Sequence, residues 1–188
     1  MKQLMRAVLI FIVLSLMTGL AYPLFVTGLA ELFFPWKASG SLITDNGRVV
    51  GSELIAQKFA KARYFHGRPS ANNYDASNSG GTNFGPASAR FIQEVKARVE
   101  QTRIEDNLRP DARIPADLVL ASGSGLDPDI SVEAALIQIP RVAKERAVSE
   151  EVLKDLVARA AEEQGGWVEP RVNLLRLNIA ADRLPGQK

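Results

Sequence analysis

The residues with the greatest potential for chemistry form a glycine-rich turn that carries two carboxylates. Residues 122–129 read SGSGLDPD and follow an apolar run that predicts a short buried strand over residues 117–121. A strand, a glycine-rich turn and a helix are the layout of a phosphate-binding unit. The turn lacks the Gly-Lys-Ser/Thr end of a P-loop and the three spaced glycines of a dinucleotide fingerprint. Asp127 and Asp129 would also repel a phosphate, which favours a tight structural turn.

The same turn raises two hydrolytic alternatives. Gly-x-Ser-x-Gly is not satisfied around Ser124, and His66 is the only histidine that could serve a serine as its base. Asp127 and Asp129 could instead act as general acid and base, or hold a hard cation through oxygen ligands. A membrane-anchored cell-envelope hydrolase that uses these two carboxylates is the alternative function. Our main prediction is that the chain has no catalytic residue and no metal site.

Two other segments combine residue types that suit binding. Residues 79–83, Ser79-Gly80-Gly81-Thr82-Asn83, resemble the Ser-Gly-Gly signature with which transporter ATPases contact a γ-phosphate, although a flexible loop has the same composition. Residues 64–70 place Tyr64, Phe65, the sole histidine and Arg68 close together. Such residues often anchor protein interfaces, whereas burial of Tyr64 and Phe65 in the domain's own core is an equal alternative.

The composition excludes several classes of protein. The 188 residues include 23 Lys+Arg, 21 Asp+Glu, one His and no Cys. Lys2 and Arg6 account for the net charge of +2, and the other cations are interleaved with carboxylates. No basic stripe is therefore present, and nucleic-acid binding is excluded. Without cysteine, the chain forms no disulfides, thiolate zinc sites or cysteine nucleophiles.

The N-terminal segment predicts a membrane anchor. Residues 7–30 are uncharged, and as a helix they would extend about 36 Å, enough to cross a hydrocarbon core of about 30 Å. The run is too long for the apolar region of a cleaved signal, and residues 32–36, LFFPW, extend it as an interfacial belt. We therefore expect an uncleaved anchor over residues 7–34. Tyr22-Pro23 predicts a kink, because Pro23 lacks a backbone donor and crowds the carbonyl four residues earlier.

The charges beside this anchor predict its orientation. Lys2 and Arg6 precede it without a nearby carboxylate, while Glu31 and Lys37 cancel on the other side. By the positive-inside rule, residues 1–6 stay in the cytoplasm and residues 35–188 form an extracytoplasmic soluble domain. The sequence thus predicts a single-pass membrane protein, and the resemblance given below implies the bacterial plasma (inner) membrane. A domain outside the cell meets no ATP or NAD, so cytosolic cofactor chemistry is disfavoured.

The outward residues predict one mixed α/β (α+β) domain with few strands. Asn46-Gly47 predicts a hairpin with strands near residues 41–44 and 48–51. The remaining expectations are a helix over residues 53–61 capped by Ser52, a long loop over 67–87, a helix over 88–106, a helix capped by Ser131 with a kink or break at Pro140, a helix over 150–164 that stops at Gly165, and a strand over 172–179.

Motifs along almost the whole chain resemble one family. The matching segments are Tyr22-Pro23, Phe34-Pro35-Trp36, Gly40-Ser41-Leu42-Ile43, Gly51-Ser52 with Leu54-Ile55, Gln57 and Phe59, Tyr64-Phe65-His66-Gly67-Arg68-Pro69-Ser70-Ala71, Ser79-Gly80-Gly81 with Asn83, Ala121-Ser122-Gly123-Ser124-Gly125-Leu126-Asp127, Gln138-Ile139-Pro140-Arg141-Val142-Ala143 and Pro170-Arg171-Val172-Asn173. In this order they are similar to the C subunit of the bacterial Kdp-type potassium-transporting P-type ATPase. The His-Gly-Arg-Pro-Ser and Gln-Ile-Pro-Arg-Val-Ala blocks carry most of the resemblance.

The resemblance implies a non-catalytic accessory subunit of an ATP-driven, high-affinity potassium uptake complex, needed for its assembly and stability. Its implied partners are a channel-like potassium-translocating subunit, a P-type ATPase subunit that hydrolyses ATP and a small single-span subunit, together with the lipid bilayer. The family is described as a catalytic chaperone that raises the ATP affinity of the ATPase subunit. The outward topology conflicts with direct contact to ATP, so such an effect would have to pass through the membrane spans.

The resemblance and the residue types together give one set of candidates for contact with a partner or a nucleotide. These candidates are Tyr64, Phe65, His66, Arg68, Ser79, Gly80, Gly81, Asn83, Ser122, Gly123, Ser124, Gly125 and Asp127.

Overall fold

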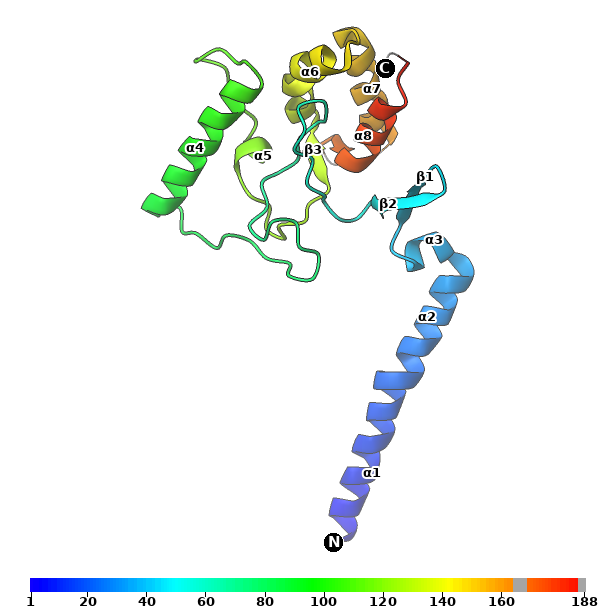
Figure 1. Ribbon diagram of the computed structural model, residues 1–188. Coiled ribbons are helices and arrows are strands. Elements are labelled where there is room, and N and C mark those ends of the chain that lie inside the picture. The colour runs from blue at the N-terminus through cyan, green and yellow to red at the C-terminus, as the bar shows by residue number, and fades with distance from the viewer. Residues whose placement is uncertain (164–168, 186–188) are drawn as a thin grey trace. The chain divides into compact units, whose positions relative to one another are not determined.

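The computed structural model of the chain describes residues 1–163 and 169–185. The chain divides into two compact units, Met1–Val50 and Gly51–Lys188, and each is described by itself (Figure 1). The first unit holds the apolar helix and most of a hairpin. The second is a small domain of helices and a few short strands.

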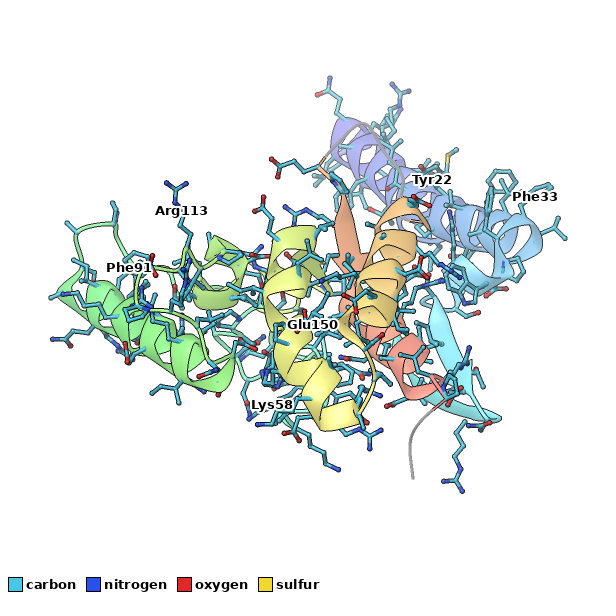
Figure 2. The ribbon with its side chains drawn as sticks, turned by 90° about the horizontal axis from the view of Figure 1, so that it is seen from above. Tyr22, Phe33, Lys58, Phe91, Arg113 and Glu150 are labelled. Carbon is cyan, nitrogen blue, oxygen red and sulfur yellow. The ribbon has the colours of Figure 1, made fainter. Side chains whose placement is uncertain are left out.

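The first unit begins with one apolar helical stretch, Lys2–Phe33, which is long and apolar enough to cross a membrane. It consists of α1 (Lys2–Leu16), the π-helical turn η1 (Met17–Ala21) and α2 (Tyr22–Phe33). Its side chains point outward, as those of Tyr22 and Phe33 do in Figure 2. The expected apolar helix is therefore confirmed.

The irregularity expected at Tyr22-Pro23 takes the form of this π-helical turn. The Tyr22 amide donates to the Met17 carbonyl, five residues earlier. Pro23 has no amide with which to continue an α-helical ladder, and its ring would crowd the preceding turn. A wider turn just before the proline provides that room without ending the helix.

A short helix and a hairpin follow. In α3 (Pro35–Ala38), the Trp36 Nε1 donates to the Leu42 carbonyl at 2.9 Å. Strands β1 (Leu42–Asp45) and β2 (Arg48–Ser52) pair around Asn46 and Gly47, whose φ angles are 48° and 76°. Two consecutive residues with positive φ are what a two-residue hairpin turn requires. The predicted hairpin is confirmed.

In the second unit, four helices contact a two-stranded antiparallel sheet (Figure 1). Ile130 lies opposite Val172 in this sheet. Its elements are α4 (Ala89–Glu105), α5 (Ala116–Val119), β3 (Asp129–Ser131), α6 (Val132–Arg146), α7 (Glu150–Glu163), β4 (Arg171–Asn173) and α8 (Leu174–Asp182). The fully buried apolar side chains belong to Phe65, Ile130, Ala134, Ala135, Ile139, Val142, Leu153, Val157, Val172, Leu177 and Ala181.

Three helix predictions are confirmed, and their serine caps explain where each helix begins. The Ser131 Oγ accepts the Ala134 amide at 3.0 Å, and Ser88 and Ser149 cap α4 and α7 in the same way. Helix α6 continues through Pro140 instead of breaking. Pro140 has no amide to donate to the Leu136 carbonyl, four residues earlier. Both residues are exposed, so water can bind that carbonyl instead. The stop expected at Gly165 lies outside the described residues.

The prediction of a helix over residues 53–61 is wrong, because these residues form no helix. The Ser52 Oγ does accept an amide, that of Leu54 at 3.1 Å, but the chain then runs on without regular structure. The Ala56 amide donates to the Leu126 carbonyl at 3.0 Å, across the domain. A long-range hydrogen bond thus replaces the helical one that local propensity favoured.

The predictions of strands over residues 117–121 and 172–179 are also wrong. The first of these segments, residues 117–121, overlaps the helical turn α5 (Ala116–Val119), in which Leu118 and Val119 are buried. Only Arg171–Asn173 forms a strand in the second segment, and Leu174–Asp182 is helix α8. The Asn173 Oδ1 accepts the Arg176 amide at 3.1 Å and so begins this helix. The apolar residues 172–179 show no clear helical periodicity in the sequence, because almost every side chain among them is buried.

Replacement of Asn173 should destabilise the protein. Asn173 caps α8, and its Nδ2 donates to the Glu53 carbonyl at 2.9 Å. Asn173→Ala removes the cap and the hydrogen bond to this partly buried carbonyl, which should lower the free energy of unfolding by about 1–3 kcal/mol. Urea unfolding of the full chain in detergent measures the change. The exposed Gln93→Ala is the control and should stay within about 0.5 kcal/mol of the parent. Equal stability of the two variants would contradict the capping role.

Candidate functional site

Two glycine motifs that lie far apart in the sequence meet in the structure. The Gly80 amide and the Ser79 hydroxyl both donate to the Ser124 carbonyl, at 2.8 and 3.1 Å. A Cβ on Gly125 would lie 2.7 Å from the Gly80 carbonyl oxygen, and one on Gly81 would lie 3.0 Å from that of Gly123. The glycines are therefore needed because the two backbones touch. We call residues 79–81 and 122–127 the loop pair.

One ion pair connects the loop pair to the segment that precedes it. The Arg68 Nη1 donates to the Asp127 Oδ2 at 2.9 Å, and the Asp127 Oδ1 accepts the Asp129 amide at 3.1 Å. The Asp129 Oδ1 in turn accepts from the Asn173 Nδ2 at 3.3 Å. Both carboxylates proposed for hydrolysis thus hold the turn in place, and this arrangement gives the hydrolase alternative no support.

Several amides of the loop pair donate to groups of the loops themselves. Besides Gly80, the Gly125 amide donates to the Ser122 carbonyl, the Leu126 amide to the Ser124 Oγ and the Asp127 amide to the Ser122 Oγ. A phosphate cradle needs amides that point at the ligand. These bonds favour the structural-turn interpretation. Asn83 follows in the same loop, exposed and with φ at 53°.

A second cluster holds the Tyr64–His66 backbone in the core. The Asn178 side-chain amide accepts from the Phe65 amide at 2.8 Å and donates to its carbonyl at 3.0 Å. Gln138 does the same for His66, at 2.7 and 3.1 Å. Two side chains thereby take the place of a neighbouring strand. Phe65 is fully buried, as the core interpretation expects.

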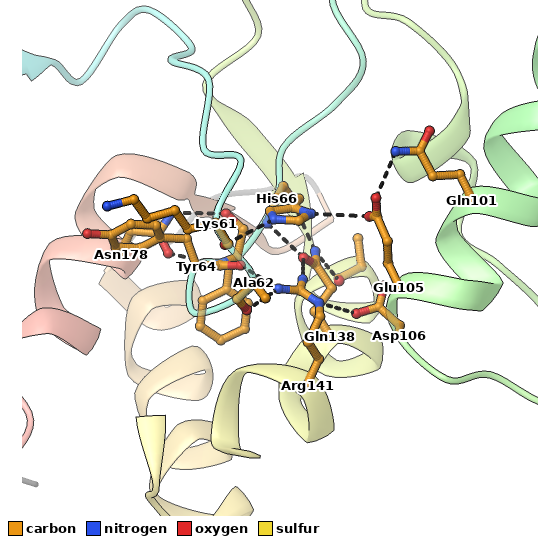
Figure 3. Close-up of polar contacts among 12 residues, drawn as sticks. Lys61, Ala62, Tyr64, His66, Gln101, Glu105, Asp106, Gln138, Arg141 and Asn178 are labelled. Carbon is orange, nitrogen blue, oxygen red and sulfur yellow. Dashed lines mark hydrogen bonds and ion pairs between the residues drawn. The ribbon is translucent and has the colours of Figure 1, made fainter. Parts of the chain in front are cut away.

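Arg141 is the centre of this cluster (Figure 3). Its Nε donates to the Asp106 Oδ1 at 2.7 Å, its Nη2 to the Gln138 Oε1 at 2.7 Å, and its Nη1 to the carbonyls of Ala62 and Tyr64. The Arg141 and Asp106 side chains are only 7% and 4% exposed. We call these contacts the Arg141 clamp. Burial raises the pKa of Asp106, and the Arg141 charge opposes that rise.

A second buried arginine holds the other side of the same segment. The Arg146 Nε donates to the Arg63 carbonyl at 2.6 Å, and its Nη1 donates to the Ala181 carbonyl at 2.8 Å. The Arg146 guanidinium lies 5.2 Å from the centre of the Tyr64 ring, a cation–π geometry. The Tyr64 hydroxyl donates to Asp182 at 3.3 Å. Tyr64 is thus engaged mainly within the domain.

His66 occupies the solvent side of the clamp. Its Nε2 lies 3.3 Å from the Lys61 carbonyl oxygen, and its Nδ1 lies 3.6 Å from a Glu105 carboxylate oxygen. Burial and the nearby Arg141 charge lower the pKa of His66. A neutral imidazole is therefore expected near neutral pH.

The sequence candidates thus divide into two groups. Arg68, the Ser-Gly-Gly motif and residues 122–127 come together in the loop pair, while Tyr64, Phe65 and His66 belong to the clamp. Residue-by-residue reasoning missed the side chains that position the second group. Gln138 and Arg141 were named only as part of a resembling block, although polar residues three apart on a core-facing helix are a usable signal.

Removal of the Arg141 guanidinium should lower the free energy of unfolding by about 3–5 kcal/mol, because it leaves the buried Asp106 carboxylate and several hydrogen-bond acceptors without a partner. Arg141→Met should also change the pH dependence of stability. Without the guanidinium, the pKa of Asp106 in the folded state rises further above its unfolded value. A carboxyl whose pKa is higher in the folded state stabilises the fold at low pH, and this contribution is lost as the pH rises. The loss of stability caused by Arg141→Met should therefore be smaller at pH 5.0 than at pH 7.5.

Urea unfolding of the full chain at both pH values measures this deficit. Arg90→Met is the matched control, because Arg90 forms an exposed pair with Glu94 and should contribute less than about 1 kcal/mol. A deficit for Arg141→Met that equals the control, or that grows on acidification, would contradict the role given to the clamp.

The close contact of the loop pair predicts a contrast between two glycines. Gly125 has φ at +69° and no room for a Cβ, so Gly125→Ala should cost about 1–3 kcal/mol. Gly123 has open space around its Cβ position, and Gly123→Ala should be nearly neutral. Thermal unfolding of the two variants provides the comparison. Similar melting temperatures would show that the loops do not pack as described.

Comparison with known proteins identifies the family. The family model described as "K+-transporting ATPase, c chain" (KdpC) matches residues 4–183. The potassium-transporting ATPase KdpC subunit of Methylobacterium nodulans is 52% identical, with both chains fully covered. KdpC subunits of Rhodopseudomonas palustris and Bradyrhizobium diazoefficiens are 48% and 46% identical, each over 97% of this chain and 97% and 98% of their own. The chain therefore belongs to the KdpC family, the c chains of the K+-transporting ATPase.

Proposed function

We propose that this accessory subunit of the potassium uptake complex acts through assembly. In this proposal, the apolar helix lies in the inner membrane against the channel-like subunit. Residues 35–188 lie outside the cytoplasm and cover the external mouth of that subunit. The other proposed partners are the P-type ATPase subunit and the small single-span subunit.

The observation that carries the proposal is the bare surface of the apolar helix. None of the residues of α1, η1 and α2 is buried within the described chain. An apolar surface of this length is stable only in lipid or against other apolar helices. A partner helix and the bilayer together meet that requirement.

Charge and aromatic residues support the outward orientation. Lys2 and Arg6 precede the apolar core of the helix, and positive residues favour the cytoplasmic side. Trp36 follows the other end, and Phe33 and Phe34 next to it are exposed. Aromatic side chains of this kind suit the boundary between lipid and water.

An indirect effect on ATP binding fits this arrangement better than a direct one. The Ser79 hydroxyl and the Gly80 amide, the groups that resemble a nucleotide contact, both donate to the Ser124 carbonyl. We therefore assign the loop pair to contact with a partner protein. Any influence on the ATPase subunit then passes through the membrane helices.

Single cysteines test both orientation and assembly, because the natural chain has no cysteine. Gln3→Cys marks the N-terminal end, and Gln93→Cys marks an exposed position on α4. A membrane-impermeant maleimide applied to spheroplasts should label Gln93→Cys at once and Gln3→Cys only after permeabilisation. The reverse pattern would overturn the orientation.

A third variant, Ser124→Cys, tests the partner contact in the same experiment. Ser124 is exposed in the isolated chain, so its cysteine should react freely when the chain is expressed alone. Co-expression with the other subunits should slow labelling of Ser124→Cys and leave Gln93→Cys as reactive as before. Equal labelling with and without partners would remove the loop pair from the proposed interface.

A further inference from the structure

A cavity of about 300 Å³ opens beside the Arg141 clamp. It lies between residues 58–69, Tyr74, the C-terminal half of α4 and α6. Figure 3 labels five of its lining residues, His66, Gln101, Glu105, Asp106 and Gln138. Its volume suits a small ligand of a few heavy atoms, and aromatic and charged side chains share its wall.

Three residues with aromatic rings are among those that line the cavity: Phe59, His66 and Tyr74. Tyr74 has φ at 62°, a left-handed conformation that a bulky residue rarely adopts. Its hydroxyl donates to the Arg68 carbonyl and its amide to the Ser70 Oγ, both at 2.9 Å, and these bonds hold it there. Strained residues of this kind concentrate at ligand sites, where the surroundings impose their position.

Among the described residues, two charged side chains that line the cavity have no Lys, Arg, Asp or Glu as an ion-pair partner. Glu105 accepts from the neutral Gln101 amide at 2.7 Å, and its other neighbour is His66. Because burial lowers the pKa of His66, that ring does not neutralise the carboxylate near neutral pH. The Lys58 Nζ lies 3.5 Å from the Asn73 Oδ1 and makes no ion pair within the described part of the chain. Lys58 lines the cavity and is exposed (Figure 2).

The other charged groups around the cavity already have partners. The Arg98 Nη2 lies 3.3 Å from Glu94, and its Nη1 donates to the Val119 carbonyl. Asp106 is paired with Arg141 in the clamp. The charges available to a ligand are therefore one ammonium and one carboxylate, which together match a molecule that carries both signs.

We propose that this cavity binds a small zwitterion with a quaternary ammonium group and a carboxylate, of the betaine class. The ammonium group lies against the rings of Phe59 and Tyr74, near the Glu105 carboxylate. Aromatic faces attract a methylated cation, whereas a primary ammonium needs an acceptor for each N–H. The ligand carboxylate pairs with Lys58 at the rim. This inference does not depend on the proposed orientation or assembly role.

Isothermal titration calorimetry of the full chain in detergent tests the proposal, with glycine betaine as the probe. Choline carries only the cation and acetate only the anion, so each should bind at least tenfold more weakly than glycine betaine. Calorimetry is preferred to thermal shift because excluded osmolytes stabilise proteins without a site. Absence of saturable heat with glycine betaine, or equal affinity for choline, overturns the proposal.

Variants locate the binding site. Lys58→Gln and Glu105→Gln should each weaken binding of glycine betaine about tenfold or more, because each removes a charged partner of the ligand. Lys96→Gln is the control, since Lys96 is exposed on α4 and does not line the cavity. Lys58 is itself exposed, so its variant should fold as the parent does. Unchanged affinity in Lys58→Gln and Glu105→Gln, or an equal loss in the control, places the ligand elsewhere and overturns the proposal.

Discussion

The second unit depends on the partners of one buried cation, the Arg141 guanidinium. A guanidinium removed from water must have its N–H groups matched, or the fold bears a large desolvation penalty. Its acceptors come from the end of α4, the Ala62–Tyr64 backbone and its own helix. The clamp therefore joins three segments that are far apart in the sequence. A buried ion pair of this kind specifies an arrangement more than it adds stability.

The position of residues 64–68 determines the rest of the candidate site. Once Phe65 is inserted in the core, His66 faces the cavity and Arg68 reaches Asp127. That ion pair orients the turn at residues 122–127, on which the Ser79-Gly80 loop rests. The polar groups of the most recognisable motifs are thus used in building the domain. This use fits a subunit of a transport ATPase that contributes shape and contacts.

Local signals were sufficient wherever a segment satisfied its own hydrogen bonds. The apolar helix, the Asn46-Gly47 hairpin and helices α4, α6 and α7 all have their turn or cap residues within the segment. Predictions were wrong for residues 53–61, 117–121 and 172–179. In the first of these segments the Ala56 amide bonds to Leu126, and in the last a buried asparagine begins a helix inside an apolar run. Neither partner is visible from local periodicity.

The sequence by itself determined the family and the membrane-compatible helix, because both depend on residue types in a fixed order along the chain. It also identified most of the residues of the loop pair without indicating that the two loops touch. Only the tertiary structure decided that contact, the Arg141 clamp and the cavity beside it. The loop contact joins Ser79 to Ser124 and the clamp joins Asp106 to Arg141, in each case through polar groups at least 35 positions apart. Such groups find their partners only after the chain has folded, so no short-range pattern encodes them.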